Sequence, residues 1–386
     1  MEQMAAIDRA YNVADIAAIA RRRLPPGLYD FIDRGAEDEV TRRENSESIK
    51  RILIRQRVGI DTSMRDITTQ IGSVVQSMPI GLAVTGMVGL LHYKGEQAMA
   101  SAAASAGVPY TLGSGNFAGM AECKEICGDL LWRQLYPCRT EALLQHHLGI
   151  ARDAGVNNLV ITLDSPQTGN REYMLRNGFM PGMLNRNAIR EMLSRPGWLM
   201  RAIVPYYLHE GGLPEMVDLP DDIRGRFGDR KVPPNPPADD YSWDTIRRIR
   251  RDWKGRLVIK GISVPEDAIT AADIGCDGVI VSNHGGRSLD GCIPSMSALP
   301  GVVDAAGSRL DVMVDGGFTR GSDVLKAIAL GAKCVWLGRA TTFGLVAAGQ
   351  AGVERVLEIF RSEISRAMAM MGATSVAELN RDFLQL

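Results

Sequence analysis

The 386-residue sequence lacks the features that mark several special classes of protein. It has no run of about 18 apolar residues, so we expect no membrane-spanning helix. Its 44 Lys and Arg nearly balance its 45 Asp and Glu, which leaves no basic surplus for binding nucleic acid. Its six cysteines include Cys123 and Cys127 in a CxxxC pattern, which indicates neither a metal site nor a disulfide scaffold. The first residues carry early acids and no long apolar core, so we expect no signal peptide and a cytoplasmic protein.

What the sequence does have is a regular alternation of apolar runs and helical segments. Several runs are continuously apolar, as buried parallel strands are, and many of the helical segments end in Gly. The eight runs cover residues 79–86, 109–114, 130–136, 158–164, 256–262, 278–284, 311–317 and 334–339. This repetition predicts an α/β fold, a (β/α)8 TIM barrel, with a doubly wound sheet as the alternative. We expect one barrel domain over 1–386, with 1–78 as an N-terminal helical extension packed on it.

A long insertion, residues 172–243, separates the fourth and fifth predicted strands. It is rich in Pro, Gly and mixed charge, which is typical of a βα-loop that serves as a lid or contact segment. Its one strongly apolar stretch, residues 197–208, could pack on a sister subunit, cover the site or touch a membrane. Arg201 and Pro205 interrupt this stretch, so peripheral membrane contact is possible but not favoured.

Nearly every predicted strand ends in polar or glycine residues, and enzymes on this barrel carry their chemistry at those ends. One or two such residues could simply terminate strands, but a full ring is harder to explain that way. The ring comprises Thr85, Gly86, Ser114, Gln134, Tyr136, Thr162, Asp164, Lys260, Ser282, His284, Asp315, Gly338 and Arg339. We therefore expect an active site at this face of the barrel.

The last two strands predict a phosphate site. "DGGFTRGSD" follows the seventh strand and "LGR" ends the eighth, where this barrel commonly binds phosphate. Glycines allow backbone N–H groups to approach an anion closely, and Arg339 adds positive charge. A plain turn is the alternative explanation for "DGG" alone.

Five side chains suggest the chemistry. Lys260 ends an apolar strand, so it either forms an internal salt bridge or stabilises developing negative charge. His284 lies among glycines after a buried strand, where a neutral imidazole can act as a base that Asp164 orients. Arg171 and Arg287 follow strand ends, and two guanidinium groups beside a base suggest a carboxylate substrate. Salt bridges at the rim are the structural alternative for both arginines.

The sequence resembles the FMN-dependent 2-hydroxy acid oxidising family, which includes glycolate oxidase, L-lactate dehydrogenase and (S)-mandelate dehydrogenase, and is most similar to the last. "VIVSNHGGRSLDG" is similar to the active-site motif of that family. Further blocks match in order over nearly the whole chain, namely "GAEDEVTRREN", "RQLY", "TLDSPQTGNRE", "LVIKGI", "VDGGFTRGSDVLKAIALGA" and "LGRATTFGLVAAGQAGV".

The resemblance implies a role for each matching residue. His284 would be the base, supported by Asp164, and Tyr136 would bind the substrate hydroxyl. Arg171 and Arg287 would hold the substrate carboxylate, while Lys260 would stabilise the reduced flavin. The remaining FMN-binding positions would be Val84, Thr85, Gly86, Gly113, Ser114, Gln134, Thr162, Ser282, Asp315, Gly316, Gly317, Phe318, Thr319, Gly338 and Arg339. The family also implies a homotetramer.

The sequence departs from the family pattern around the substrate. Phe31 stands where the family has a carboxylate-binding tyrosine, Val84 where a proline is usual, and Gly113 where a flavin-contacting serine is common. Gly115 stands where some members carry a bulky aromatic residue. These changes imply an enlarged pocket and a bulky substrate, lactate-like or mandelate-like.

We expect an enzyme that oxidises an (S)-2-hydroxy acid to the 2-oxo acid, passing electrons to oxygen, a quinone or a protein. The alternatives are an oxygen-using oxidase or monooxygenase, and an FMN barrel that oxidises a modified substrate in a specialised biosynthetic pathway. A flavin-binding scaffold without turnover predicts loss of the base or the arginines, and both are present.

Overall fold

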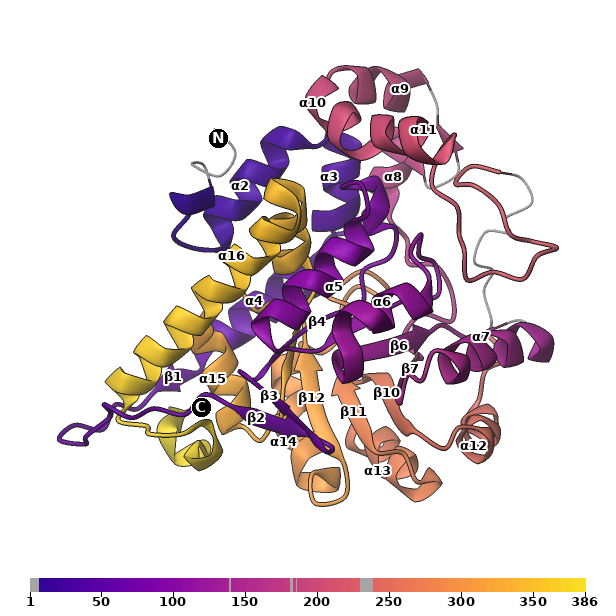
Figure 1. Ribbon diagram of the computed structural model, residues 1–386. Helices are drawn as coiled ribbons and strands as arrows, with labels where there is room; N and C mark the ends of the chain where they lie inside the picture. The colour runs from indigo at the N-terminus through magenta and orange to yellow at the C-terminus, as the bar shows by residue number, and fades with distance from the viewer. Residues whose placement is uncertain (1–6, 139, 181–182, 185, 230–238) are drawn as a thin grey trace.

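A computed structural model describes residues 7–138, 140–180, 183–184, 186–229 and 239–386 of the chain. At its centre is a closed barrel of parallel strands, which confirms the predicted fold (Figure 1). In chain order the strands are β4 (Ile80–Leu82), β5 (Tyr110–Leu112), β6 (Leu131–Leu135), β7 (Asn158–Thr162), β10 (Arg256–Ile262), β11 (Gly278–Val281), β12 (Asp311–Asp315) and β13 (Val335–Leu337). Pairing of β13 with β4, and of β7 with β10, completes the ring.

The barrel encloses its own apolar core. Alternate residues of the strands point inward, so Trp132, Val160 and Trp336 meet on the axis. The rings of Trp132 and Trp336 pack edge to face, with centroids 4.9 Å apart. The other face of each strand packs on the surrounding helices, and for this reason the strands are apolar on both faces over most of their length. The barrel is therefore a filled scaffold that holds its strand ends in fixed positions.

A helix follows each strand. In chain order these are α5 (Gly95–Ala106), α6 (Met120–Cys127), α7 (Glu141–Asp153), α12 (Trp243–Asp252), α13 (Pro265–Ile274), α14 (Ser295–Ala306), α15 (Gly321–Ala329) and α16 (Arg339–Met371). Helix α16 breaks at Ala348 and Gly349, where the backbone is not helical. A capping box is present at "SVAE", where Ser375 and Glu378 cap the short helix Val376–Glu378.

The N-terminal segment brings three helices to the barrel: α2 (Val13–Arg23), α3 (Pro26–Asp33) and α4 (Val40–Arg51). α2 packs along α16, whereas the turn between α3 and α4 reaches the C-terminal ends of the strands. There the backbone N–H of Ala36 donates to the carbonyl of Gly286, at 2.8 Å. The N-terminal segment thus forms one wall of the barrel mouth.

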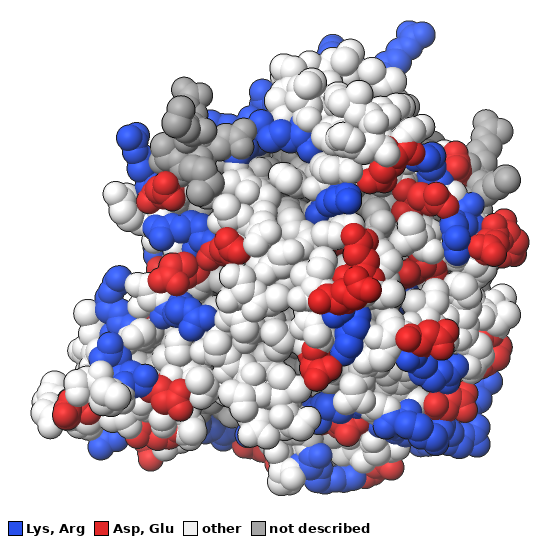
Figure 2. All heavy atoms as spheres, in the orientation of Figure 1, with Lys and Arg blue, Asp and Glu red and all other residues white. Residues whose placement is uncertain are grey.

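The insertion after β7 folds into a helical cap. It contains α8 (Glu172–Asn177), the hairpin β8 (Phe179–Met180) and β9 (Met183–Leu184), α9 (Arg186–Leu193), α10 (Pro196–Trp198), a π-helical turn (Leu199–Ile203) and α11 (Val204–Glu210). Trp198 and Tyr206 are buried beneath the cap, whereas Met200, Tyr207 and Leu208 are exposed. The cap is largely free of charged atoms in Figure 2, where it forms the white dome at the top. Within the described residues, no helix combines the length and hydropathy that crossing a bilayer requires.

Candidate active site

His284 lies just beyond the end of β11 in an unusual backbone conformation. Its φ angle is 57°, and Gly285 and Gly286 follow with φ angles of 61° and 74°. A left-handed conformation is uncommon for a residue with a side chain, and it persists only where the surrounding structure enforces it. The two glycines adopt it without steric cost. The turn directs the His284 side chain toward the ends of β6 and β7.

The imidazole of His284 joins side chains from two other strand ends. Its Nδ1 lies 2.8 Å from Asp164 Oδ1, and its Nε2 lies 3.2 Å from the Tyr136 hydroxyl. A carboxylate only accepts, so Nδ1 carries the proton and donates it to Asp164. Nε2 therefore keeps its lone pair, and the tautomer is the one that a base at this position needs.

The local charges keep both groups in the states that base chemistry requires. Burial opposes ionisation of Asp164, but the charges of His284 and Lys260 outweigh it and hold the pKa of Asp164 well below its usual range. Burial lowers the pKa of His284, and Asp164 opposes that effect only in part. The carboxylate is therefore ionised and the imidazole neutral at pH 7.

Lys260, in β10, forms a second buried cluster beside the histidine. Its Nζ lies 3.1 Å from Asp315 Oδ2 and 3.8 Å from Asp164 Oδ2, and it donates to Ser282 Oγ at 2.7 Å. Burial alone would lower the pKa of Lys260, but the two carboxylates outweigh it and raise that pKa. The internal salt bridge considered above exists, and it holds a permanent positive charge at the barrel mouth.

Arg171 and Arg287 lie next to each other near His284. Arg171 Nε donates to the Arg287 carbonyl at 3.1 Å, and Arg287 donates to the carbonyls of Ile32 and Arg34. Neither forms an ion pair in the part of the chain that the structure describes, so rim salt bridges do not explain them. Burial, followed by the charge of Arg171, lowers the pKa of Arg287 to about 9. Two adjacent cations without a neutralising acid favour an anionic ligand.

Phe31 packs directly against Arg287. The guanidinium carbon of Arg287 lies 5.3 Å from the centroid of the Phe31 ring, which is the geometry of a cation–π contact. The ring orients the arginine but offers no hydroxyl to a carboxylate.

The predicted positions at the ends of β4 to β7 lie near a small hollow, which Val84 helps to line. Gln134 donates to Thr162 Oγ1 at 2.9 Å, and Thr85 accepts from Thr342 Oγ1 of α16 at 3.3 Å. A Cβ at Gly113 would lie 2.9 Å from Val84 Cγ2, whereas one at Gly86 or Gly115 would meet nothing within 4 Å. Ser114 lies between these two open positions in the chain. The hollow is lined by Ala83, Val84, Thr111, Val160, Lys260, Ile280 and Trp336.

The glycines predicted to approach a phosphate have a packing role as well. A Cβ at Gly317 would lie 2.8 Å from backbone atoms of Asn45 in α4, so this residue must be glycine whether or not an anion binds. The backbone N–H of Thr319 donates to Asp323 Oδ2 at 3.1 Å. Gly316, Gly317 and Phe318 lie between β12 and this capped turn, which leaves their N–H groups as the predicted phosphate donors.

Arg339 follows Gly338 at the start of α16. Its guanidinium donates to the carbonyls of Asp33 and Gly285, both at 2.9 Å, and to that of Arg34 at 3.4 Å. Burial and the nearby charge of Arg42 lower the pKa of Arg339 to about 10. The side chain thus ties the N-terminal segment to the glycines after His284, and its predicted contact with phosphate stays a prediction.

The mouth of the barrel has unsatisfied polar atoms of the kind that a flavin would satisfy. Gln134 Oε1 and Asp315 Oδ1 are buried acceptors without a hydrogen-bond partner among the described residues. Buried acceptors usually have partners, so these two favour a ligand with donor groups. With the cationic Lys260 between them, they fit the ring and ribityl donors of the cofactor that the resemblance implies.

Sequence reasoning missed two groups in this site. Ser165 Oγ lies 3.2 Å from His284 Nδ1 and from Asp164 Oδ1, and it also contacts Ser288. Its position next to Asp164 in "LDSP" was the available signal. Asn45 exchanges hydrogen bonds with Asn283, 2.8 Å each, and this buried pair fastens α4 to the turn before His284. No pattern in the sequence of α4 indicates that Asn45 belongs to the site.

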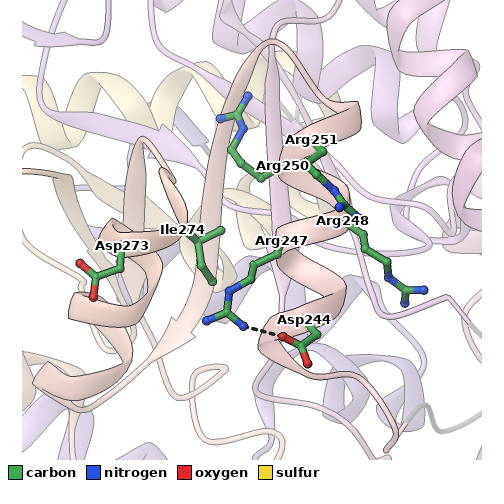
Figure 3. A pocket seen from close by; sticks show the side chains of 7 residues that line it. All are labelled: Asp244, Arg247, Arg248, Arg250, Arg251, Asp273 and Ile274. Atoms are coloured by element: carbon green, nitrogen blue, oxygen red, sulfur yellow. Dashed lines mark hydrogen bonds and ion pairs between the residues drawn. The ribbon is translucent and has the colours of Figure 1, made fainter.

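A separate hollow lies on the outside of the barrel between α12 and α13 (Figure 3). Arg247 pairs there with Asp244 at 2.5 Å, and Arg250 pairs with Asp277 at 2.9 Å. None of the residues that line it was predicted from the sequence to carry chemistry. The candidate active site is therefore the mouth of the barrel around His284.

Comparison with known proteins gives matches over nearly the whole chain. The model of a family described as FMN-dependent dehydrogenase matches residues 20–386. An L-lactate dehydrogenase of Caulobacter vibrioides is 38% identical over 97% of both chains. Among solved structures, a monotopic membrane protein, (S)-mandelate dehydrogenase, has a TM-score of 0.91 and 33% identity, covering 98% of this chain and 99% of its own. A mandelate oxidase has a TM-score of 0.79 and 31% identity over 97% and 98% of the two chains.

Proposed function

The chain belongs to the FMN-dependent dehydrogenase family, and from that membership we propose that it oxidises a bulky (S)-2-hydroxy acid to the corresponding 2-oxo acid. The observation that carries the proposal is the environment of His284. Asp164 occupies one ring nitrogen, the other nitrogen faces Tyr136, and Arg171 and Arg287 lie nearby without a neutralising acid.

Each side chain has a specific task in this reaction. Arg171 and Arg287 bind the carboxylate of the substrate, and Tyr136 donates a hydrogen bond to its hydroxyl oxygen. Nε2 of His284 takes up one substrate proton, and Asp164 stabilises the resulting imidazolium. Either the hydroxyl or the C2 proton satisfies this geometry. The reaction removes two electrons and two protons from the substrate: His284 takes one proton, and FMN, when bound, would accept the two electrons and the second proton.

The cofactor would be held by polar and glycine residues at the C-terminal ends of the barrel strands. Gln134, Thr162 and Ser282 would bind its ring system, Asp315 its ribityl chain, and the backbone of 316–319 with Gly338 and Arg339 its phosphate. The buried Lys260 ammonium would stabilise negative charge that develops when the cofactor accepts electrons.

A bulky substrate is supported by the surroundings of Gly115 and Phe31. A side chain at Gly115 would meet nothing within 4 Å, and Phe31 adds an apolar surface beside Arg287. An aromatic or branched side chain would bury apolar area there that a methyl group cannot. Transfer of electrons directly to oxygen is the second candidate, favoured by the similarity to a mandelate oxidase.

Anaerobic reduction of the bound flavin tests this function. Purified protein carrying FMN should lose its visible flavin absorbance when an aromatic (S)-2-hydroxy acid is added, and glycolate should act more slowly. The R enantiomer is the control. Re-oxidation by air, by a quinone or by a dye then identifies the acceptor. An FMN-loaded protein that no 2-hydroxy acid bleaches would refute the proposal.

We also propose that the cap binds the surface of a membrane. Met200, Tyr207 and Leu208 expose 62%, 58% and 74% of their surface, and Arg186 and Arg190 of α9, in the same cap, are exposed as well. Exposed apolar and basic residues in one cap suit the interface of an anionic bilayer. The similarity to a monotopic membrane protein supports this choice over a subunit contact or a lid.

Flotation with lipid vesicles tests the cap. The protein should float with vesicles that contain anionic lipid, and Tyr207→Ser with Leu208→Ser should abolish flotation without slowing flavin reduction. Val75→Ser, which changes an exposed apolar residue away from the cap, is the matched control. Flotation that survives the double substitution would contradict the proposal, as would a variant that changes only the oligomeric state.

A further inference from the structure

Arg133 is an arginine without any exposure inside the wall of the barrel. It belongs to β6 and points outward, next to Gln134, which points to the mouth. Its NH1 donates to Asp218 Oδ2 at 2.8 Å and to the Gly113 carbonyl at 3.0 Å. Its NH2 donates to Nδ1 of His147 at 3.0 Å. Burial and the charge of Arg133 lower the pKa of His147 to about 3, so this histidine is a neutral acceptor.

Asp218 belongs to a different part of the chain, the 211–229 loop that follows the cap. Its side chain is 7% exposed. Besides the ion pair, Oδ1 accepts from the backbone N–H of Met120 at 3.3 Å, at the start of α6. Its backbone carbonyl lies 3.2 Å from His146 Nε2. Asp218 is therefore the point at which the end of the insertion is fastened to the barrel.

The same loop contacts residues 113–119, which connect β5 to α6. Phe227 packs edge to face on Phe117, with centroids 6.2 Å apart, and a Cβ at Gly119 would touch Val217. With the Arg133 bond to Gly113, the connection is held at its beginning, middle and end. A connection without regular structure owes its position to such contacts.

Residues 113–119 do not line the hollow themselves, but they begin beside Val84, which does. Gly113 packs against Val84 and Gln134, and Val84 and Lys260 both line the hollow. Gly115 opens onto free space. A chain of direct contacts therefore runs from Asp218 through Arg133 and Gly113 to the side of the proposed substrate pocket.

We infer that Arg133 and Asp218 are positioning residues: their buried ion pair lets the 211–229 loop hold residues 113–119 where they set the size of the pocket for the substrate side chain. This inference rests on the proposed function, because it assigns the space beside Gly115 to that side chain. A pair that only stabilised the fold would not affect the choice between substrates.

The test compares ligands of different bulk. FMN-loaded protein is titrated with an aromatic 2-oxo acid and with pyruvate, and binding is followed by the flavin absorbance. Arg133→Met and Asp218→Asn should each reduce the preference for the aromatic acid about tenfold. With 2-hydroxy acids the same variants should raise KM for the aromatic substrate far more than they lower kcat. The double variant Arg133→Met with Asp218→Leu removes both charges. If the single variants do not fold, the preference of this double variant for the aromatic acid is measured in their place.

Asp311→Asn is the matched control. It breaks the ion pair of Asp311 with Arg256, 2.6 Å long, which joins the first residues of β12 and β10 at the far end of the barrel. It should lower the melting temperature without changing the preference. An unchanged preference in the FMN-loaded double variant would overturn the inference. If no 2-hydroxy acid reduces the flavin of the wild-type protein, the proposed function is refuted. The ratio of the dissociation constants for the aromatic 2-oxo acid and pyruvate then still tests this inference. Failure of the wild-type protein to bind either acid would overturn both.

Discussion

His284→Ala is expected to slow reduction of the bound flavin by an aromatic 2-hydroxy acid by about 10⁴-fold, at the upper end of what a positioned base contributes. The variant should still bind FMN, because the side chains proposed to hold the cofactor are others. Stopped-flow absorbance under anaerobic conditions measures the rate. His209→Ala, at an exposed position on the cap, is the control and should behave as wild type.

The pH dependence of the same rate gives an independent check. The base acts in its neutral form, so the rate should rise with pH through the pKa of His284 and then become constant. Burial lowers that pKa from the ordinary value of 6.5, so the plateau should be reached by neutral pH. His284→Gln should lose this rise. A rate that still rises above pH 8, or a His284→Ala variant that reduces at the wild-type rate, would assign the base to another group.

Much of the barrel could be predicted from the sequence because its strands are short and apolar on both faces. Such runs stand out against the glycine-ended helices between them, and the run at 256–262 coincides with β10 (Arg256–Ile262). Other strands end earlier than predicted, as at β11 (Gly278–Val281), because the residues that follow leave the sheet to form the active-site turn. The prediction thus located the strands, and with them the polar residues at or just beyond their ends.

The rest of the site depends on contacts between segments far apart in the chain. Asn45 reaches Asn283 across 238 positions, and Arg133 meets Asp218 across 85. No local pattern encodes these distances. Gly317 shows the converse: its sequence context suggested an anion, and the structure adds a helix backbone packed against it. The left-handed backbone at His284 could not be predicted either, since a positive φ is uncommon for residues other than glycine.

Lys260→Met should be the most damaging change outside the histidine. It removes the positive charge shared by Asp315 and Asp164, which lie 3.1 and 3.8 Å from Nζ, and leaves two buried carboxylates without it. Breaking a buried ion pair costs about 3–5 kcal/mol, so the melting temperature should fall clearly. Flavin reduction should slow about 10²–10³-fold, as expected when one group that stabilises developing charge is lost. Lys254→Met, at an exposed lysine, is the control.

The pH dependence of stability identifies the cause of that loss. In the wild-type protein the pKa of Asp164 is depressed, so this group stabilises the fold above its unfolded pKa of about 3.9 and loses that contribution as the pH falls through its folded value. In Lys260→Met one of the charges that depress it is gone, so the pKa of Asp164 rises and protonation relieves the buried charge. The difference in unfolding free energy between the two proteins should therefore narrow as the pH falls from 7 toward 4. Denaturant melts at both pH values measure it, and a constant difference would show that lost packing, not charge, causes the instability.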